Sequence, residues 1–286
     1  MRLNLRVNTQ LRADYVKGVK WLKAETGIKK APSNGAPINT YDYYVDVHQG
    51  ATSGRNQNPD SSNAAHRSPA FLPWHSAFIT MFEKNLQRVL NDPRFELPYW
   101  DWAYDAMLAD PRQAVVWSDD FMGGDGDPVT TDPFREGEWR LYNDPNSDSL
   151  YRRFGPKFGV TSLPPQSDVE EAMGFTVYDT SPWNASSRGS FRNKLEGWDG
   201  GGKPQLHNQT HVWVGGAMLP MSSPNDPVFF LHHCNVDRLW RQWQAKHPDL
   251  GYRPNENDTR QGGVDENKWI HHVMWGVDKT PESQWD

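Results

Sequence analysis

The residues in this sequence best suited to chemistry are its histidines. His232 and His233 are adjacent within NDPVFFLHHCNVDRLWRQWQ, residues 225–244, one of the most apolar stretches of an otherwise polar chain. Both flank the apolar stripe of that segment almost equally, so periodicity does not choose which one points inward. His207 and His211 are four residues apart and share one face if their segment is helical. Burying several imidazoles without partners is costly, so together they predict a metal site.

The ligand type narrows the choice of metal. Imidazoles without thiolate or carboxylate partners favour copper, zinc, nickel or iron. Calcium or magnesium would need converging carboxylates, which the histidine-bearing segments lack. Zinc held by three histidines and a water is a real competitor to copper. Because the histidines arrive in separate pairs of segments, the sequence predicts two metal ions.

Four segments with helical periodicity must position these histidines. In the first, His48 lies on the apolar face of a helix whose candidate caps are Asn39 and Thr40. In the second, His75 begins a core helix over residues 75–89. The third and fourth are the two segments described above. We expect these four helices to surround the metal site.

The rest of the chain indicates a mainly α-helical fold with long loops. Residues 11–22 predict a further helix, which carries no histidine and would pack outside the set. Residues 105–190 are rich in Gly, Pro and Asp and are interpreted mainly as long loops and short turns. No internal repeat, low-complexity tract or charge block divides the sequence, so we expect residues 1–286 to form a single domain.

Composition excludes several functions. The formal net charge is −6 and no Lys/Arg cluster alternates with aromatics, so nucleic acid is a poor partner. No apolar run could span a membrane and the first residues lack an apolar signal core, so we expect a cytoplasmic chain or one exported with a helper protein. Cys234 is the only cysteine, so no internal disulfide forms. The 14 Trp, 12 Phe and 10 Tyr supply a core and suit a pocket for flat ligands.

Several motifs resemble those of bacterial tyrosinases, members of the type-3 copper proteins. The stretch AAHRSPAFLPWHSAFITMFEKNLQ, followed by LPYWDW, is similar to their first copper motif. LHNQTHVWVGGAM, with SPNDPVFFLHHCNVDRLWRQWQ after it, is similar to the second. FMGGDG, VTTDPF and GSFRNKLEGW also resemble bacterial members. The resemblance covers nearly the whole chain and implies an antiparallel four-helix bundle that holds a dinuclear copper site.

The resemblance also implies a ligand set for two copper ions. The ions would be bound by two triads: His48, His66 and His75, and His207, His211 and His233. His232 would then be a buried neighbour that hydrogen-bonds elsewhere. Asp237 resembles a position that supports the site by hydrogen bonding, while its spacing alone also fits a helix salt bridge to Arg241. Ala64 stands where many fungal and plant relatives have a cysteine that forms a thioether to a histidine, so that crosslink is not expected.

By the same resemblance, the enzyme uses O2 to oxidise o-diphenols to o-quinones and to ortho-hydroxylate monophenols, the chemistry of melanin formation. A phenol with a pKa near 10 is only about 0.1% ionised at pH 7, so hydroxylation gains from a base. The resemblance assigns this role to Glu196, acting through a water that Asn208 also holds. It places Val212 and Met221 beside the substrate. Phe229 would stack on the substrate ring, although helix periodicity equally predicts a core role for it.

Three alternatives stay open. A catechol oxidase or o-aminophenol oxidase would lack efficient monophenol hydroxylation. A hemocyanin-like O2 carrier would cover the same metal centre, whereas the chain as given shows no C-terminal shielding domain, so we expect an open site. A zinc hydrolase would bind zinc in place of copper. Phenols and O2 are the expected small-molecule partners, a copper-delivery helper protein is a further candidate partner, and the sequence does not define the oligomeric state.

Overall fold

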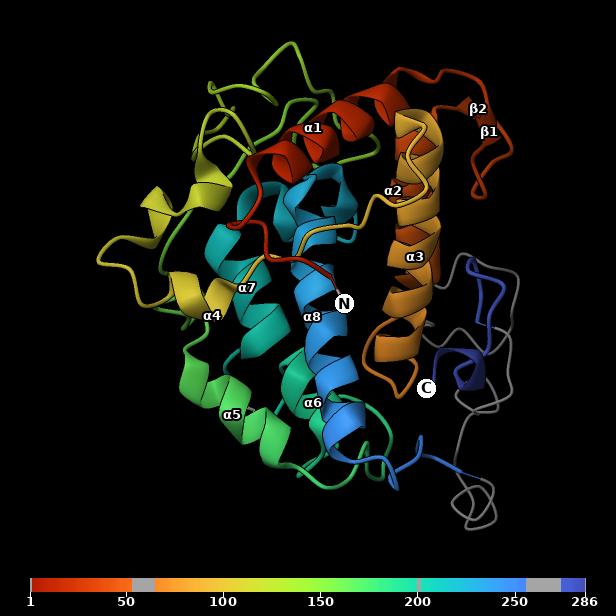
Figure 1. Ribbon diagram of the computed structural model, residues 1–286, viewed down its shortest axis with the longest axis vertical. Coiled ribbons are helices and arrows are strands. Elements are labelled where there is room, and N and C mark those ends of the chain that lie inside the picture. The colour runs from red at the N-terminus through yellow and green to blue at the C-terminus, as the bar shows by residue number, and fades with distance from the viewer. Residues whose placement is uncertain (1, 53–64, 200–201, 256–273, 286) are drawn as a thin grey trace.

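The computed structural model describes residues 2–52, 65–199, 202–255 and 274–285, so Ala64 lies outside the described residues. The fold is mainly α-helical, with one short antiparallel pair of strands, β1 (Lys29–Lys30) and β2 (Pro37–Ile38) (Figure 1). The helices are α1 (Thr9–Ala24), α2 (Thr40–Thr52), α3 (Phe71–Leu90), α4 (Trp102–Asp105), α5 (Gln166–Gly174), α6 (Phe191–Glu196), α7 (Leu206–Val214) and α8 (Val228–Lys246). Short 3-10 turns are η1 (Pro111–Gln113), η2 (Val115–Trp117), η3 (Gly216–Met218), η4 (Ser223–Asn225) and η6 (Glu282–Gln284). None of the described helices is long and apolar enough to cross a membrane.

The predicted four-helix core is confirmed, with histidines on α2, α3, α7 and α8. α3 packs against α8, and α8 packs against α7. α2 is tied to α3 where the Tyr44 hydroxyl donates to the Met81 carbonyl oxygen, 2.8 Å away. The side chain of Asn39 accepts from the Asp42 amide at 2.7 Å and caps α2, as its position predicted. α1 lies outside this set against α2 and α3, also as predicted (Figure 1).

Aromatic side chains fill the space between these helices. Phe82 of α3 stacks on Phe230 of α8 with ring centroids 3.6 Å apart. Tyr41 of α2 meets both rings edge-on, at 5.8 and 5.9 Å. Each large buried apolar side chain contributes about 1.5–3 kcal/mol to folding. A chain with few aliphatic residues thus builds its core from rings, as its composition predicted.

The second histidine helix begins earlier than predicted. α3 starts at Phe71 rather than at His75, and Pro73 is tolerated because it lies in the first turn, where backbone N–H groups have no partner within the helix. His75 therefore sits in the second turn, with its Nδ1 2.9 Å from the Phe71 carbonyl oxygen. This position anchors the ring against the helix backbone.

Residues 105–190 are mostly loops and turns, as predicted, but they include α5, and α6 follows directly after them. The sequence reasoning missed both helices. α5 has only Val169 and Ala172 on its buried face, too few to stand out within a region rich in Gly, Pro and Asp, and α6 is buried on every side, so it lacks the one-sided apolar periodicity that predicts a helix. α5 packs against α6, and α6 packs against α7. These contacts bring Glu196, the last residue of α6, next to the histidines of α7.

A buried ion pair fixes the start of α8 to the long loops. Arg152 donates to both carboxylate oxygens of Asp226, at 2.7 and 2.8 Å, and both side chains are completely buried. Arg152 also donates to the Met122 and Gly123 carbonyl oxygens. One Asp226 oxygen accepts from the amide of Val228, the first residue of α8, at 3.1 Å. The position of α8 therefore depends on loop residues far away in the sequence.

Candidate metal centre

Three histidines converge to form the first candidate metal group. His48 comes from α2, His75 from α3, and His66 from the segment before α3. Ligand nitrogens of the three residues lie within 4.8 Å of one another. Their ring centroids are 4.9–5.7 Å apart. Because His66 lies outside any helix, no periodicity could place it, and only the family resemblance had selected it.

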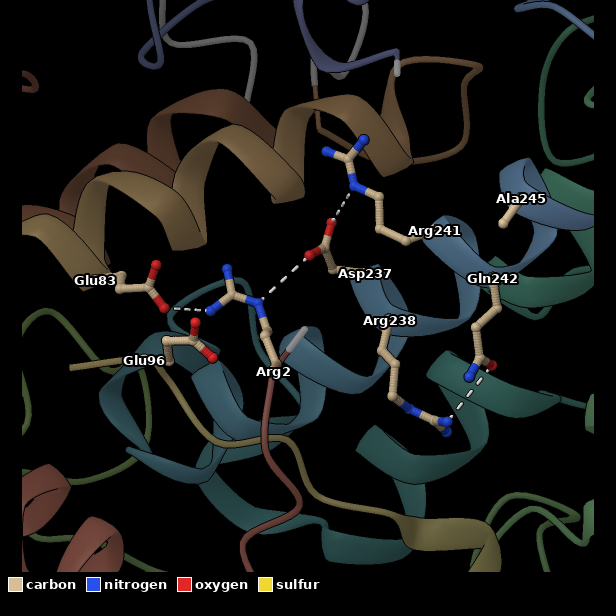
Figure 2. Close-up of a pocket in the computed structure, with 8 residues that line it drawn as sticks. All are labelled: Arg2, Glu83, Glu96, Asp237, Arg238, Arg241, Gln242 and Ala245. Atoms are coloured by element: carbon tan, nitrogen blue, oxygen red, sulfur yellow. Dashed lines mark hydrogen bonds and ion pairs between the residues drawn. The ribbon is translucent and has the colours of Figure 1, made fainter. Parts of the chain in front are cut away.

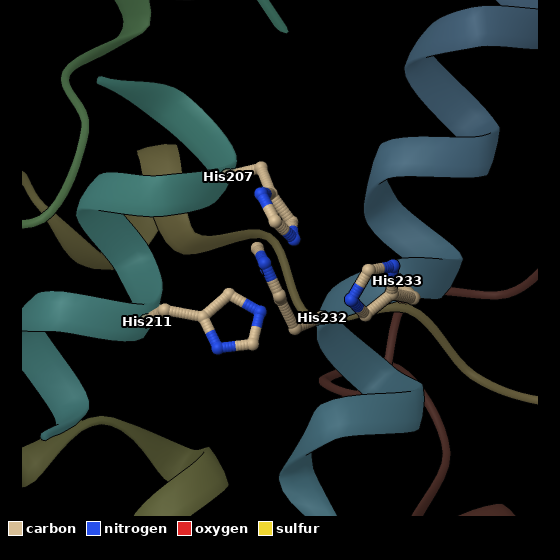
Figure 3. Close-up of side chains that lie close together, drawn as sticks. All are labelled: His207, His211, His232 and His233. Atoms are coloured by element: carbon tan, nitrogen blue, oxygen red, sulfur yellow. The ribbon is translucent and has the colours of Figure 1, made fainter. Parts of the chain in front are cut away.

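The second candidate group contains four histidines rather than three. His207 and His211 project from α7 toward α8, and His232 and His233 point back from α8 (Figure 3). Ligand nitrogens of all four lie within 4.8 Å of one another. The His232 ring lies 5.0 and 4.9 Å from the rings of His207 and His211, and the His233 ring lies 4.9 and 5.8 Å from them. Distance alone therefore does not select one member of the adjacent pair.

The two groups face each other. The His233 ring stacks on the His75 ring, with centroids 4.2 Å apart and planes 12° from parallel. His207 lies 6.2 Å from His66 and 6.3 Å from His75. Two ions bound by groups this close would form a single dinuclear site.

Hydrogen bonds fix which nitrogen of several rings is free to bind a metal. The Nδ1 atoms of three histidines lie at hydrogen-bond distance from backbone carbonyl oxygens: His48 with Met221 (2.8 Å), His75 with Phe71 (2.9 Å) and His211 with Met218 (2.7 Å). A neutral imidazole that donates from Nδ1 has its lone pair on Nε2. The Nε2 atoms of His48 and His75 are buried and have no hydrogen-bond partner in the part of the chain that the structure describes. Metal-binding histidines are typically anchored through their other nitrogen in this way.

His207 is anchored in the same way by two acceptors. Its Nδ1 lies 3.0 Å from the side-chain oxygen of Asn208 and 3.2 Å from the backbone oxygen of Glu196. Its Nε2 is buried, and no described residue forms a hydrogen bond with it. The neighbour Asn208 thus helps to orient a candidate ligand.

One loop orients a histidine in each group. Met218 and Met221 lie in the segment between α7 and α8, and their carbonyl oxygens accept from His211 of the second group and His48 of the first. Because the two acceptors are close in sequence, the loop sets both rings relative to each other. A dinuclear site needs this common frame, since the separation of its metals depends on both groups.

Burial keeps these imidazoles neutral. Desolvation lowers the pKa of His48 and His211 to about 4, although their hydrogen bonds to carbonyl groups oppose the fall. Desolvation and neighbouring imidazoles hold the pKa of His66 and His207 well below the usual range. A neutral imidazole is the form that binds a metal. The donor set, neutral imidazoles without thiolate or carboxylate, fits copper.

A cavity of about 430 Å³ opens onto both groups. Ligand pockets typically measure about 300–1,000 Å³, so this one suits a single small aromatic molecule. Val212 and Met221, expected beside the substrate, both line it. Phe229 does not line it in the described structure. Its ring is completely buried beneath the histidines, 5.1 Å from His48 and 4.1 Å from His233, where helix periodicity predicted a core role.

Glu196 is completely buried, and both its carboxylate oxygens accept hydrogen bonds. Oε1 lies 2.6 Å from the backbone nitrogen of Arg67, and Oε2 lies 2.9 Å from the guanidinium of Arg192. Burial raises the pKa of Glu196, and the charge of Arg192 opposes that rise. Asn208 lines the cavity, and its Nδ2 is buried without a hydrogen-bond partner among the described residues. Glu196 is not among the described residues that line the cavity, so Asn208 is the one of the two that a substrate could contact.

The structure does not support the expectation that Asp237 stabilises the histidines, because no hydrogen bond among the described residues joins Asp237 to one of them. Asp237 lies in a separate cleft of about 350 Å³ beside α3 and α8, where it pairs with Arg2 at 3.5 Å and Arg241 at 3.6 Å (Figure 2). The pair with Arg241 is the salt bridge that spacing offered as the alternative. A carboxylate is better stabilised between two guanidinium groups than among neutral rings. Nearby Cys234 is buried, which raises its pKa to about 12 and leaves it an apolar thiol.

Gly197 permits the close approach of α6 to α7. Its φ is +106°, and an added Cβ would lie 2.1 Å from the Gln205 carbonyl oxygen. We expect Gly197→Ala to lower the free energy of unfolding by about 1–3 kcal/mol, because it combines strain with a backbone clash. Gly174→Ala is the control, since that Cβ would meet nothing within 4 Å. Urea unfolding measures both variants, and equal effects would contradict this role of Gly197.

Comparisons with known proteins agree with this geometry. Residues 38–246 match the family model for the common central domain of tyrosinase. The chain is 43% identical to the tyrosinase of Streptomyces glaucescens over 220 residues, which cover 75% of this chain and 76% of that relative. It is 40% identical to grixazone synthase of Streptomyces griseus over 242 residues, which cover 73% of this chain and 76% of the relative.

Among solved structures, a polyphenol oxidase variant from Thermothelomyces thermophila matches with a TM-score of 0.64, covering 86% of this chain and 70% of that chain. The sequence identity is 22%, so this likeness shows the fold alone. The family itself is shown by the family model, which spans more than half of the chain, and by the Streptomyces relatives. The chain therefore belongs to the tyrosinase family, the dinuclear copper enzymes that oxidise phenols with O2.

Proposed function

We propose which residues of this phenol oxidase hold its two copper ions: His48, His66 and His75 for one, and His207, His211 and His233 for the other. The observation that carries the proposal is the pair of facing histidine groups, most of whose rings are buried and whose imidazoles are neutral. Within the second group we assign His233, because its ring stacks directly on His75 of the first. His232 is then a buried neighbour of the ligand His207.

Copper supplies the binding and activation of O2 when both sites are loaded. The chain holds the ligand rings in place through backbone carbonyl groups and admits a flat ring to the cavity above them. Val212 and Met221 would contact that ring. Phe229 supports His48 and His233 from beneath, so its position does not support the substrate contact expected of it.

We extend the proposal to ortho-hydroxylation of monophenols. Presenting a phenolate at neutral pH costs roughly 4 kcal/mol for a phenol of pKa near 10, so a base is required. The buried Nδ2 of Asn208 has no hydrogen-bond partner among the described residues, and the backbone oxygen of Glu196 lies 3.2 Å from the Nδ1 of His207 on α7. A water held by the Asn208 side chain and the Glu196 carboxylate would carry the phenol proton to Glu196. Glu196 thus acts without touching the substrate.

Two variants test this proton path. We expect Glu196→Gln to lower the turnover of monophenols by at least about tenfold while catechol turnover changes by less than about threefold. Asn208→Ala also removes an acceptor of the His207 Nδ1, so it should lower both turnovers, that of monophenols by at least about tenfold more than that of catechol. Asn208→Ala is needed because an amide at position 196 would place a donor against the Arg67 or Arg192 donors. Steady-state rates with tyramine and catechol, and copper content, measure the effect. Equal losses with both substrates would show structural damage rather than loss of a base.

The activity itself is tested with copper-loaded protein and four substrates side by side: tyrosine, tyramine, catechol and o-aminophenol. We expect all the phenols to react, with a lag for the monophenols. Turnover of catechol alone would identify a catechol oxidase, and preference for o-aminophenol an aminophenol oxidase. Reversible O2 binding without turnover would identify a carrier, and zinc without copper a hydrolase. The relatives named tyrosinase and grixazone synthase have nearly equal identity, so only this assay separates the activities.

We also propose that residues 1–286 form one copper-binding domain, supported by the single core cluster that the described helices share. Copper delivery by a helper protein is supported by the burial of most ligands, which a free ion would have to reach through the cavity. The chain would then work in the cytoplasm or be exported with that helper. Copper uptake with and without candidate helpers measures the need for delivery.

A further inference from the structure

Arg67 is the only charged residue among the described residues that line the metal-site cavity. The rest of the lining consists of histidines, apolar side chains and uncharged polar groups such as Asn208. A single guanidinium in such a wall gives the cavity a positive potential, although the whole chain has a formal net charge of −6. The cavity therefore favours a ligand with a negative charge.

The backbone and side chain of Arg67 are both held in place. Its backbone has a φ of +55°, and its amide donates to the Glu196 carboxylate at 2.6 Å. Its guanidinium lies 4.9 Å from the ring centroid of Trp198, another residue of the cavity wall. Stacking on an indole leaves the edge of the guanidinium open for hydrogen bonds. Arg67 thus presents a positioned donor edge at the cavity.

The donor edge of Arg67 has no carboxylate partner in the described part of the chain. The residue is exposed, and no ion pair joins its guanidinium to a described acidic side chain. Asp199, next to Trp198, pairs with Arg188 instead, at 3.5 Å. All other described charged pairs near the site involve residues outside the cavity, such as Arg192 with Glu196. Among the residues that the structure describes, no acidic side chain neutralises the Arg67 guanidinium.

We propose that Arg67 is a specificity-determining residue that selects phenols and catechols whose side chain ends in a carboxylate. The proposal rests on the proposed function, because it assumes that the substrate hydroxyl points at the histidines. The tail of the ring then points toward the mouth, where Arg67 is exposed and the guanidinium fork matches a carboxylate with two parallel hydrogen bonds. An ammonium group at the same position is repelled.

The test compares three catechols with the same ring: dihydrocaffeate, neutral methylcatechol and cationic dopamine. For the copper-loaded wild-type chain we expect kcat/KM to decrease in that order. Arg67→Gln is expected to lower kcat/KM for dihydrocaffeate by about 5- to 30-fold, mainly through KM, because a charge-assisted pair in a half-open cavity is lost. The same variant should change kcat/KM for methylcatechol by less than about twofold. Arg67→Lys should recover part of the loss, since it keeps the charge but not the fork.

A matched control removes the same charge elsewhere. The side chain of Arg94 is 92% exposed and lies outside the cavity, so Arg94→Gln should leave kcat/KM unchanged for all three catechols. An equal loss for all three catechols in Arg67→Gln would overturn the proposal in favour of a structural role. An unchanged kcat/KM for dihydrocaffeate in Arg67→Gln would overturn the proposal as well.

A binding measurement separates this proposal from the proposed function. Phenylpropionate and phenethylamine have no hydroxyl group to oxidise, so their Kd for the copper-free chain can be measured by NMR titration. We expect the Kd of phenylpropionate to rise by about 5- to 30-fold in Arg67→Gln and that of phenethylamine to fall or stay the same. Failure of wild-type enzyme to oxidise methylcatechol would overturn the proposed function alone. An unchanged Kd for phenylpropionate would overturn the role of Arg67 alone.

Discussion

Replacing His233 with glutamine is expected to reduce bound copper from about two ions per chain to about one and to lower catechol turnover by more than about 100-fold. The same replacement at His232 should leave both ions bound and lower catechol turnover by less than about tenfold. Loss of a residue that hydrogen-bonds to a metal ligand typically lowers metal affinity or activity by about 10–100-fold. Removal of the ligand itself should therefore have a larger effect. Atomic absorption gives the copper content, and oxygen uptake gives the turnover.

The two histidines are matched controls for each other, because they are adjacent on α8, completely buried and members of the same group. His233 spans the two groups, stacked at 4.2 Å on His75 and 4.9 Å from His207. The described aromatic rings near His232 belong to the second group, apart from Trp102, whose ring centroid lies 6.4 Å from that of His232. The His207 backbone also opposes the burial-driven fall in the pKa of His232, whereas every influence on the pKa of His233 lowers it.

Three other outcomes would revise the ligand set. Loss of an ion in His232→Gln with both ions kept in His233→Gln would reverse the assignment. Loss of one ion in each variant would mean that the four histidines of the second group act together. Retention of both ions and full activity in both variants would remove α8 from the metal centre.

Local sequence patterns predicted the parts of the site that depend on short-range geometry. Helix periodicity placed His48 and His75 on inward faces, and the four-residue spacing of His207 and His211 put both on one side of α7. These relations follow from the pitch of a helix alone. Helix periodicity could not decide which of His232 and His233 on α8 binds a metal, because both are buried and both belong to the second group.

The parts that could not be predicted depend on contacts between distant residues. α6 has no apolar stripe because other segments cover it on all sides, so Glu196 gave no sign of burial in the sequence. The i, i+4 spacing of Asp237 and Arg241 predicted their ion pair, whereas the contact of Asp237 with Arg2 could not be predicted, because Arg2 comes from the opposite end of the chain. A substitution at a long-range contact is therefore the sharper test of how the fold positions α8.

Arg152→Met is expected to lower the free energy of unfolding of the copper-free chain by about 3–5 kcal/mol, because it leaves the buried Asp226 carboxylate without its charge partner. Arg140 and Asp148 form the control pair, with side chains 80% and 82% exposed, so Arg140→Met should change stability by less than about 1 kcal/mol. Urea unfolding measures both, and similar small changes would contradict the role of the buried pair.

The double variant Arg152→Met, Asp226→Leu separates charge burial from lost packing. If the cost of Arg152→Met comes from an unpaired buried charge, removing Asp226 as well should restore part of the lost stability. If the cost comes from the carbonyl groups of Met122 and Gly123 that Arg152 also satisfies, the double variant should be no more stable than the single one. We expect partial recovery, because an uncompensated charge costs more than neutral carbonyl groups that water can reach once the loop relaxes. Because α8 carries His232 and His233, copper affinity should follow the same order as stability.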